Sequence, residues 1–358
     1  MDSMAQMMKE LTEIHGASGF ESEVRRKMEE YLEPLTEEIL KDRLGSVIAR
    51  KTGDVNGPRV LIAGHLDEIG FMVTHITDQG FLRFQQLGGW WTHTLPSQRV
   101  MIKTRKGERL GIIGCKAPHV LTKEEQNKLI PLTQLFIDVG AGSREEVEEM
   151  GIRLGDPVTP LSDFFTMRNG ELWGGKALDN RAGCALAVEV LKRLQGEDHP
   201  NIVFSGATVQ EEVGLRGAAT VANLVKPDIA FALDVGAAYD TPGFESYQAK
   251  ADIGKGPLLM LMDFTMVPHI GLRDLVIDTA DELEISLQYD ALMQGGTDGG
   301  RFHLNGIGCP TVAIGFPTRY IHSHNSLMSR SDFEQAATLL TALIKKLDHD
   351  TVQKLFAH

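Results

Sequence analysis

The sequence has few cysteines and no long run of apolar residues. Cys115, Cys184 and Cys309 lie far apart and form no CxxC pair. We therefore expect buried free thiols in a reducing cytoplasm, in preference to a catalytic cysteine. No segment approaches the roughly 20 apolar residues of a membrane span, and no apolar block follows basic residues at the N-terminus. A transmembrane helix and a signal peptide are therefore not expected, and we predict a cytoplasmic protein.

Positive charge is also in deficit. The 36 lysines and arginines face 49 aspartates and glutamates, which gives a net charge of −13 at pH 7. Phosphate backbones and anionic lipids are repelled by such a surface, so nucleic acid and membrane are not expected as partners. The hydrophobic share of 42% is ordinary for a globular chain that buries a core. A length of 358 residues favours two to three domains.

Two patterns divide the chain. From Phe71 to Pro160, short apolar runs are broken by glycine and proline, which is typical of a small β-barrel or sandwich. Before and after this stretch, predicted strands and helices alternate. That alternation favours an α/β fold with a mostly parallel central sheet and helices on both faces. We predict one domain formed by residues 1–69 and 161–358, with residues 70–160 inserted as a small β-barrel-like domain.

The predicted elements outside the insertion follow from apolar spacing. The main ones are strands at 59–63, 202–209, 229–233, 284–289 and 311–315, and helices at 218–224, 272–282 and 333–347.

Histidines and acidic residues recur where these predicted strands end or where a helix begins. They are His65, Asp67, Asp179, Glu211, Glu212, Asp234 and His322. Taken singly, such an aspartate is usually a helix cap and such a histidine is usually exposed or hydrogen-bonded. Ligands of α/β folds bind at the carboxyl ends of the strands, so we expect these side chains to share one edge of the sheet.

Glu211 and Glu212 are neighbours at the end of the predicted strand 202–209. Adjacent residues on extended backbone point to opposite sides. We therefore expect one metal ligand and one base, and not two facing acids.

Two histidines and several carboxylates form a ligand set that suits Zn²⁺, Co²⁺ or Mn²⁺ better than Ca²⁺. The set is too large for one tetrahedral ion. A site with two ions about 3.5–4 Å apart, sharing one bridging carboxylate, would use all of them. Such a site activates a water at neutral pH, and a carboxylate outside the metal shell can take and return its proton.

Five segments together closely resemble motifs of the cytosolic di-metal aminopeptidases, which include the tetrahedral, glutamyl and deblocking enzymes. They are Gly64–Gly70, Leu178–Arg181, Val209–Gly217, Leu233–Asp234 and Tyr320–Ser323. The resemblance covers nearly the full chain, including an insertion after the first histidine motif. It implies a metal-dependent aminopeptidase that hydrolyses the N-terminal residue of peptides through a hydroxide bound to two metal ions.

The resemblance also implies a role for each metal ligand. Asp179 would bridge two divalent ions, foremost Zn²⁺ with Co²⁺ or Mn²⁺ as alternatives. His65 and Asp234 would complete one ion's protein ligands, and Glu212 and His322 the other's.

The resemblance implies that Glu211 is the general base and that Asp67 accepts a hydrogen bond from the second nitrogen of His65. It further implies that the insertion forms dimers, and that these dimers assemble into tetrahedral dodecamers.

The loop Gly296, Thr297, Asp298 to Arg301 resembles a family substrate-binding loop, but Arg301 is larger and more basic than expected there. We weigh two interpretations: Arg301 reaches the pocket for the N-terminal residue and pairs with a substrate carboxylate, or it lies on the following helix and pairs with a surface acid. His324 stands where many relatives carry proline, which leans toward the glutamyl branch.

Three other functions remain open. A metal-dependent deacylase or carboxypeptidase would differ only in its substrate pocket. An endoglucanase-type glycoside hydrolase of the retaining kind needs two facing carboxyl groups about 5–5.5 Å apart, which Glu211 and Glu212 on a strand would not provide. A non-catalytic metal-binding shell would have no use for Glu211 as a spare base.

Overall fold

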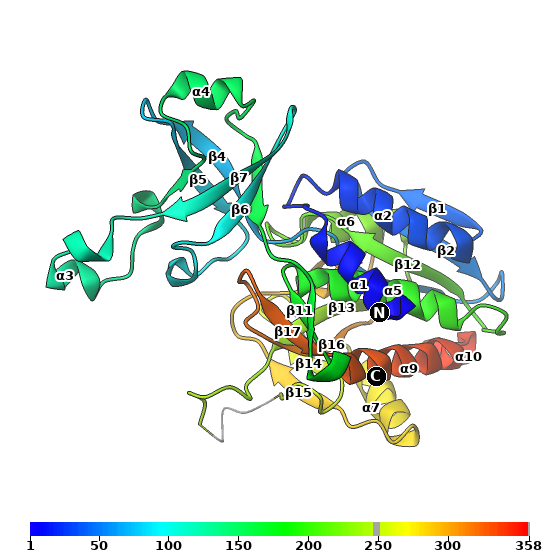
Figure 1. Ribbon diagram of the computed structural model, residues 1–358. Coiled ribbons are helices and arrows are strands. Elements are labelled where there is room, and N and C mark those ends of the chain that lie inside the picture. Colours follow the sequence, from blue (N-terminus) through cyan, green and yellow to red (C-terminus); the bar gives the residue numbers. More distant parts are fainter. Residues whose placement is uncertain (246–250, 357–358) are drawn as a thin grey trace.

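The computed structural model describes residues 1–245 and 251–356. It consists of an α/β body and a closed β-barrel that projects from it (Figure 1). The helices are α1 (Ser3–Glu13), α2 (Ser22–Leu32), α3 (Lys123–Gln126), α4 (Arg144–Glu149), α5 (Leu178–Arg193), α6 (Arg216–Val225), α7 (Ile270–Glu282), α8 (Gly299–Phe302), α9 (Arg330–Lys346) and α10 (His349–Leu355). The strands of the body are β1 (Glu38–Lys41), β2 (Val47–Thr52), β3 (Arg59–His65), β10 (Phe165–Met167), β11 (Leu172–Gly175), β12 (Ile202–Thr208), β13 (Ile229–Ala237), β14 (Leu258–Met262), β15 (Gln288–Ala291), β16 (Thr311–Arg319) and β17 (Ser326–Ser329).

The sheet of the body is mixed. Its strands run in the order β1-β2-β12-β3-β13-β16-β17-β11-β10; β14 also pairs with β16, and β15 pairs with β14. The four strands β12, β3, β13 and β16 are parallel to one another. Antiparallel strands flank them on both sides. The predicted α/β class is confirmed, and the parallel part of the sheet is its centre.

Helices cover both faces of this sheet, as predicted. Successive residues of a strand point to opposite faces. In β3, Val60 and Ile62 pack into the core beneath α1, α2, α5, α7 and α9, whereas Leu61 and Ala63 pack into the core beneath α6 and α8. A central strand that is buried on both faces is continuously apolar. This continuous apolar run allowed the strand to be predicted from the sequence.

The barrel is formed by β4 (Gly70–Ile76), β5 (Phe81–Leu87), β6 (Arg99–Thr104), β7 (Gly107–Gly114), β8 (Phe136–Asp138) and β9 (Pro157–Pro160). It closes in the order β4-β5-β8-β7-β6-β9. Alternate residues such as Val100, Ile102 and Val158 point inward and fill its core. The prediction of an inserted β-barrel is confirmed. Its strands join the body through contacts such as that between Lys103 Nζ and Glu23 Oε2, 2.5 Å apart.

Several predicted boundaries are wrong. Strands β13 and β16 extend to Ala237 and Arg319, beyond the predicted ends at residues 233 and 315, because their parallel pairing continues through less apolar residues. The predicted strand 284–289 begins late, at Gln288. Glu284 adopts a positive φ of 54°, and the N–H of Ile285 bonds back to Ala280, so these residues end α7 instead.

The three cysteines are free, as predicted; Cys184 and Cys309 are buried and Cys115 is half-buried. Within the described ranges, the helices are too short or too polar to cross a lipid bilayer. The cytoplasmic location stays a prediction.

Candidate metal centre

The structure brings the predicted histidines and carboxylates together at one edge of the sheet. His65 is the last residue of β3, and Asp179 lies at the start of α5. Glu211 and Glu212 follow β12, and His322 follows β16. These strands are the parallel centre of the sheet, so their carboxyl ends meet. The position of Asp234 differs from the prediction.

Asp234 lies inside β13 and not after it, because the strand continues to Ala237.

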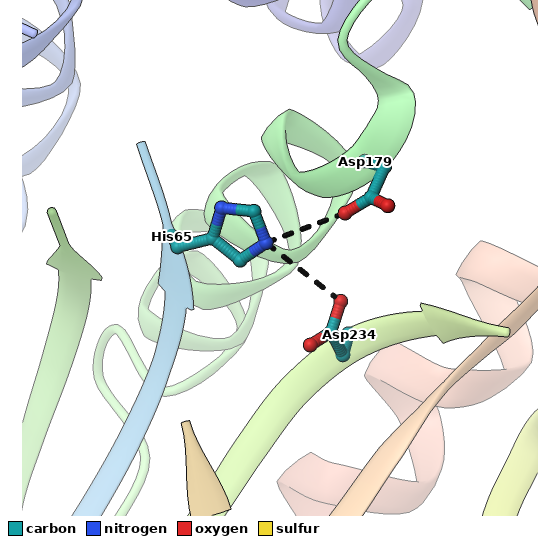
Figure 2. A group of neighbouring side chains, drawn as sticks. All are labelled: His65, Asp179 and Asp234. Atoms are coloured by element: carbon teal, nitrogen blue, oxygen red, sulfur yellow. Dashed lines mark ion pairs between the residues drawn. The ribbon is translucent and has the colours of Figure 1, made fainter. Parts of the chain in front are cut away.

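Asp179 stands between the two histidines. Its Oδ1 is 3.3 Å from His65 Nε2, and its Oδ2 is 3.2 Å from His322 Nε2. Asp234 Oδ1 lies 4.0 Å from the same nitrogen of His65 (Figure 2). Glu212 Oε1 lies 3.6 Å from His322 Nε2. The side chains form three groups of possible ligands: His65–Asp179–Asp234 and Asp179–Glu212–His322, which share Asp179, and His65–Glu211–Glu212.

The backbone around Asp179 departs from the helix that follows it. Ala177 has a positive φ of 55°, Asp179 and Asn180 are non-helical, and the peptide bond between them is cis. The side chain of Asn180 donates to the carbonyl of Leu233, 2.7 Å away, and accepts from the N–H of Gly183 at 2.9 Å. The first bond ties the start of α5 to the neighbouring strand β13, and the second fixes the Asn180 side chain within α5.

Each histidine is oriented through its second ring nitrogen. Nδ1 of His65 donates to the backbone carbonyl of Asp67 at 3.0 Å, and Nδ1 of His322 donates to the carbonyl of Gly89 at 2.9 Å. A carbonyl can only accept, so Nε2 of each ring is left to face the cluster. Gly89 belongs to the inserted stretch, which thereby helps to orient a side chain of the body.

The carboxylate of Asp67 lies within ion-pair distance of His65 and also accepts hydrogen bonds from other groups. Its Oδ1 is 3.4 Å from His65 Nδ1, farther than the backbone carbonyl of the same residue. The carboxylate also accepts from the backbone N–H groups of Glu211 and Glu212, at 2.9 and 3.1 Å, and from the Ser18 hydroxyl at 2.6 Å. Asp67 therefore orients the turn that carries the two glutamates.

That turn corrects the expectation that the two glutamates point apart. Beyond Thr208 the chain leaves the extended conformation, Gln210 has a positive φ of 56°, and the N–H of Gly214 bonds to the carbonyl of Glu211. As a result, oxygens of Glu211 and Glu212 and a nitrogen of His65 all lie within 4.8 Å of one another. The argument that neighbouring carboxylates could not face each other is wrong.

The cluster concentrates negative charge in a buried place. Burial, and then the charge of Asp179, raise the pKa of Glu212 to about 8. Burial raises the pKa of Asp234 well above its ordinary value, and the charge of Asp179 adds to this. Burial alone would lower the pKa of His322, but Asp179 and Glu212 raise it to about 10. These carboxylates compete for too few positive groups.

Burial also raises the pKa of Glu211 well above its ordinary value, although His65 acts in the opposite direction. In addition, Glu212 Oε1 is buried without a hydrogen-bond partner in the described structure. A buried carboxylate oxygen without a partner is costly, and a divalent cation would satisfy it. The residues present therefore fit one or two divalent metal ions.

A buried ion pair lies next to the cluster, between the residues before α5 and the segment that follows His65. Lys176 Nζ lies 2.7 Å from Glu68 Oε1, with both side chains almost fully buried. The guanidinium of Arg181 donates to the backbone carbonyls of Leu66 and Leu11, each at 2.5 Å. These contacts hold the segment after His65 against the start of α5.

A cavity of about 580 Å³ opens onto the cluster. Gly296 and Thr297 line it, as the loop resemblance implied. Leu215, Phe264 and Leu292 form apolar parts of its wall. Sequence reasoning missed Phe264 and Leu292 because they lie far along the chain from the metal-ligand segments.

The other two residues of the predicted substrate loop lie elsewhere. Asp298 is buried beside the Thr208 hydroxyl, which donates to it, and burial raises its pKa to about 7. Arg301 is exposed on α8 and is not among the described residues that line the cavity. The structure thus places Arg301 on the helix, as in the second of the two interpretations.

Comparisons with known proteins find relatives that match most of this chain. The model of the M42 glutamyl aminopeptidase family matches residues 45–339. The glutamyl aminopeptidase of Lactococcus lactis subsp. cremoris is 35% identical over 97% of this chain and 98% of its own.

Solved structures match this chain as well. The TET aminopeptidase of Thaumarchaeota archaeon SCGC AB-539-E09 is 46% identical, with a TM-score of 0.96 over 99% of this chain and 100% of that one. The TET1 peptidase of Pyrococcus horikoshii, which can assemble into a tetrahedron or a large octahedral shell, is 32% identical, with a TM-score of 0.85 over 96% of this chain and 100% of that one.

Proposed function

The chain belongs to the M42 glutamyl aminopeptidase family and is a metallo-aminopeptidase, and we propose that it removes N-terminal residues of peptides with two divalent cations held around Asp179. One observation carries the two-ion proposal. The two oxygens of Asp179 face different histidines, Oδ1 toward His65 and Oδ2 toward His322, at 3.3 and 3.2 Å. A carboxylate that divides its oxygens between two groups of ligands is suited to bridge two ions.

In this proposal, His65 and Asp234 would hold one ion together with Asp179, and Glu212 and His322 would hold the other. Zn²⁺ is the first choice, and Co²⁺ or Mn²⁺ would accept the same ligands. When bound, the ions lower the pKa of water and polarise the substrate carbonyl.

Glu211 is the proposed general base. It takes a proton from the attacking water and returns it to the leaving amine, which is the chemistry that a carboxylate outside the metal shell supplies. Its backbone N–H is held by Asp67, so its position is set by the segment that also carries His65.

The cavity beside the cluster is the proposed binding place for the N-terminal side chain. Gly296 allows the loop to approach the wall closely, since a Cβ there would lie 2.6 Å from a side-chain carbon of Thr265. Thr297 is held by Asp263, whose Oδ2 accepts from its hydroxyl at 2.9 Å.

The alternative functions are less well supported. The short separation of Glu211 and Glu212 removes the geometric argument against a retaining glycoside hydrolase, but a glycosidase would leave the two oriented histidines without a role. A deacylase or carboxypeptidase would use the same ligands on another substrate. Membership in an aminopeptidase family favours cleavage at the N-terminus of peptides over the glycosidase, deacylase and carboxypeptidase functions.

The test is a set of peptides with a free N-terminus, assayed after metal removal and after metal is added back. We expect turnover of the free peptides, its loss with a chelator, and its recovery with Zn²⁺, Co²⁺ or Mn²⁺. The matched N-acetylated peptides and cello-oligosaccharides should stay intact. Cleavage of the acetylated peptides, or turnover that survives chelation, would contradict the proposal.

We also propose that residues 70–160 carry the contacts between subunits. Support comes from apolar side chains exposed on the barrel, such as Leu110 and Ile112 of β7, and from the assembly of the P. horikoshii relative. The expected assembly is a dimer and, from dimers, a tetrahedral dodecamer.

Replacing residues 70–160 with a short glycine linker should therefore yield a smaller species in light scattering. Activity is not a suitable measurement for this variant, because it lacks Gly89, which orients His322. A deletion variant that keeps the mass of the parental assembly would refute the proposal.

A further inference from the structure

A second cavity adjoins the one at the metal centre. Its volume is about 830 Å³, and the two cavities share Gly89, Ile321 and His322 as lining residues. The rest of its wall comes from the inserted stretch, between Trp90 and Gln98, and from the loop Tyr320–Asn325 that follows β16. A molecule bound at the metal centre can therefore extend past His322 into this space.

One wall of this cavity carries an exposed aromatic side chain, that of Trp91. Trp90 is anchored in the barrel: its indole N–H donates to the carbonyl of Gly70 at 3.2 Å, and its ring stacks on Phe71. Trp91, in contrast, is 62% exposed and meets only the edge of His93 among the ring contacts of the described residues. Exposed tryptophan is characteristic of binding surfaces, because it offers a large apolar area with a polar end.

His324 supplies an independent sign of a ligand. The residue is only 3% exposed and lines this cavity, and neither of its ring nitrogens has a hydrogen-bond partner in the described structure. Its ring lies 5.3 Å from that of Trp90. Buried polar groups nearly always have a partner, so an imidazole with two free nitrogens is suited to bond a ligand in the cavity.

We propose that this cavity binds the leaving-group side of a peptide substrate, with the second residue of the peptide against Trp91 and its backbone within the reach of His324. The inference rests on the proposed aminopeptidase function. The N-terminal residue of the peptide occupies the metal-site cavity, and the rest of the peptide must extend out of that cavity. The neighbouring cavity begins at the shared residue His322.

The lining also indicates which second residue fits. Among the described residues that line the cavity, none is Asp, Glu, Lys or Arg. A charged side chain would lose water there without gaining an opposite charge, because both ring nitrogens of His322 are already used, one by Gly89 and the other by the proposed metal ion. The cavity therefore favours peptides with an apolar or aromatic second residue over peptides with a charged one.

The test compares two substrates that share one N-terminal residue. One is the aminoacyl amide, whose leaving group is ammonia, and the other is a tetrapeptide with phenylalanine in second place. In Trp91→Ala, kcat/KM should fall about tenfold more for the tetrapeptide than for the amide, since the lost aromatic contact concerns only the longer substrate. Wild-type protein should also prefer phenylalanine to aspartate in second place.

Two further variants complete the test. His324→Leu should show the same selective loss, with metal content measured because His322 is close in the chain. Tyr289→Ala is the matched control: Tyr289 is an exposed aromatic residue of β15 and lines neither cavity, so the ratio of the two substrates should stay at the wild-type value. Light scattering of each variant reports whether the assembly is intact.

Equal losses on both substrates, or no change in Trp91→Ala, would overturn the inference while leaving the aminopeptidase proposal in place. A loss that accompanies a smaller assembly would assign Trp91 to a subunit contact instead and would likewise overturn it. If wild-type protein hydrolyses neither substrate, both proposals fail.

Discussion

Replacing Glu211 with glutamine lowers the rate of peptide hydrolysis by a factor of about 10²–10⁴, the usual cost of losing a general base, and leaves the metal content at the wild-type level. Glutamine keeps the size of the side chain and its ability to hydrogen-bond, but it cannot take a proton. The backbone N–H of Glu211 still bonds to Asp67 in this variant, so the turn that carries it should be preserved.

The neighbouring glutamate provides the matched control. Glu212→Gln changes the same chemical group one residue away, in the ligand group with Asp179 and His322. We expect this variant to lose metal, as measured by elemental analysis after dialysis, whereas Glu211→Gln retains it. An oxygen of Glu211 also lies 3.7 Å from His65 Nε2, so metal content is the measurement that separates the two roles. Metal loss in Glu211→Gln would make Glu211 the ligand and reverse the two roles.

Replacing Asp179 with alanine has the largest expected effect on metal binding. Asp179 belongs to both groups of proposed metal ligands, so its removal takes a ligand from each ion and also removes the negative charge between two cations. We expect both equivalents of metal to be lost and activity to fall with them.

Asp234→Ala is the comparison for this prediction, since Asp234 belongs to the His65 group and not to the His322 group. It should lower the affinity for one equivalent and leave the other bound. Titration of both variants with Zn²⁺, followed by calorimetry, measures the number of ions directly. One tightly bound equivalent in Asp179→Ala would count against a bridging role.

The metal centre illustrates what strand order alone can predict. His65, Glu211, Glu212 and His322 follow strands that the apolar pattern located, and parallel strands end at one edge, so their proximity could be expected. The exact direction of each side chain could not be predicted from the sequence. Glu211 and Glu212 converge because Gln210 adopts a positive φ, and no local pattern required that conformation.

The surroundings of the centre were less predictable still. Gly89 and Trp91 belong to the inserted stretch, and they lie next to His322 only because the segment between β5 and β6 packs against the body. Phe264 and Leu292 reach the cavity from segments that carry no metal-ligand pattern. Arg301 shows the converse: its position in a glycine-rich loop suggested the pocket, but the short helix α8 leaves it exposed outside the cavity lining.

The sequence by itself determined the α/β class, the inserted barrel, the family and the residue types of the candidate metal centre. These depend on local periodicity and on side chains whose order along the chain is sufficient information. Only the tertiary structure decided the lengths of β13 and β16 and the turn that brings the two glutamates together. It also decided which carbonyl orients His322, and it formed the second cavity, which Trp91 and His324 line. Each of these depends on contacts between segments far apart in the chain, where the neighbour that pairs, packs or hydrogen-bonds is set by the whole fold.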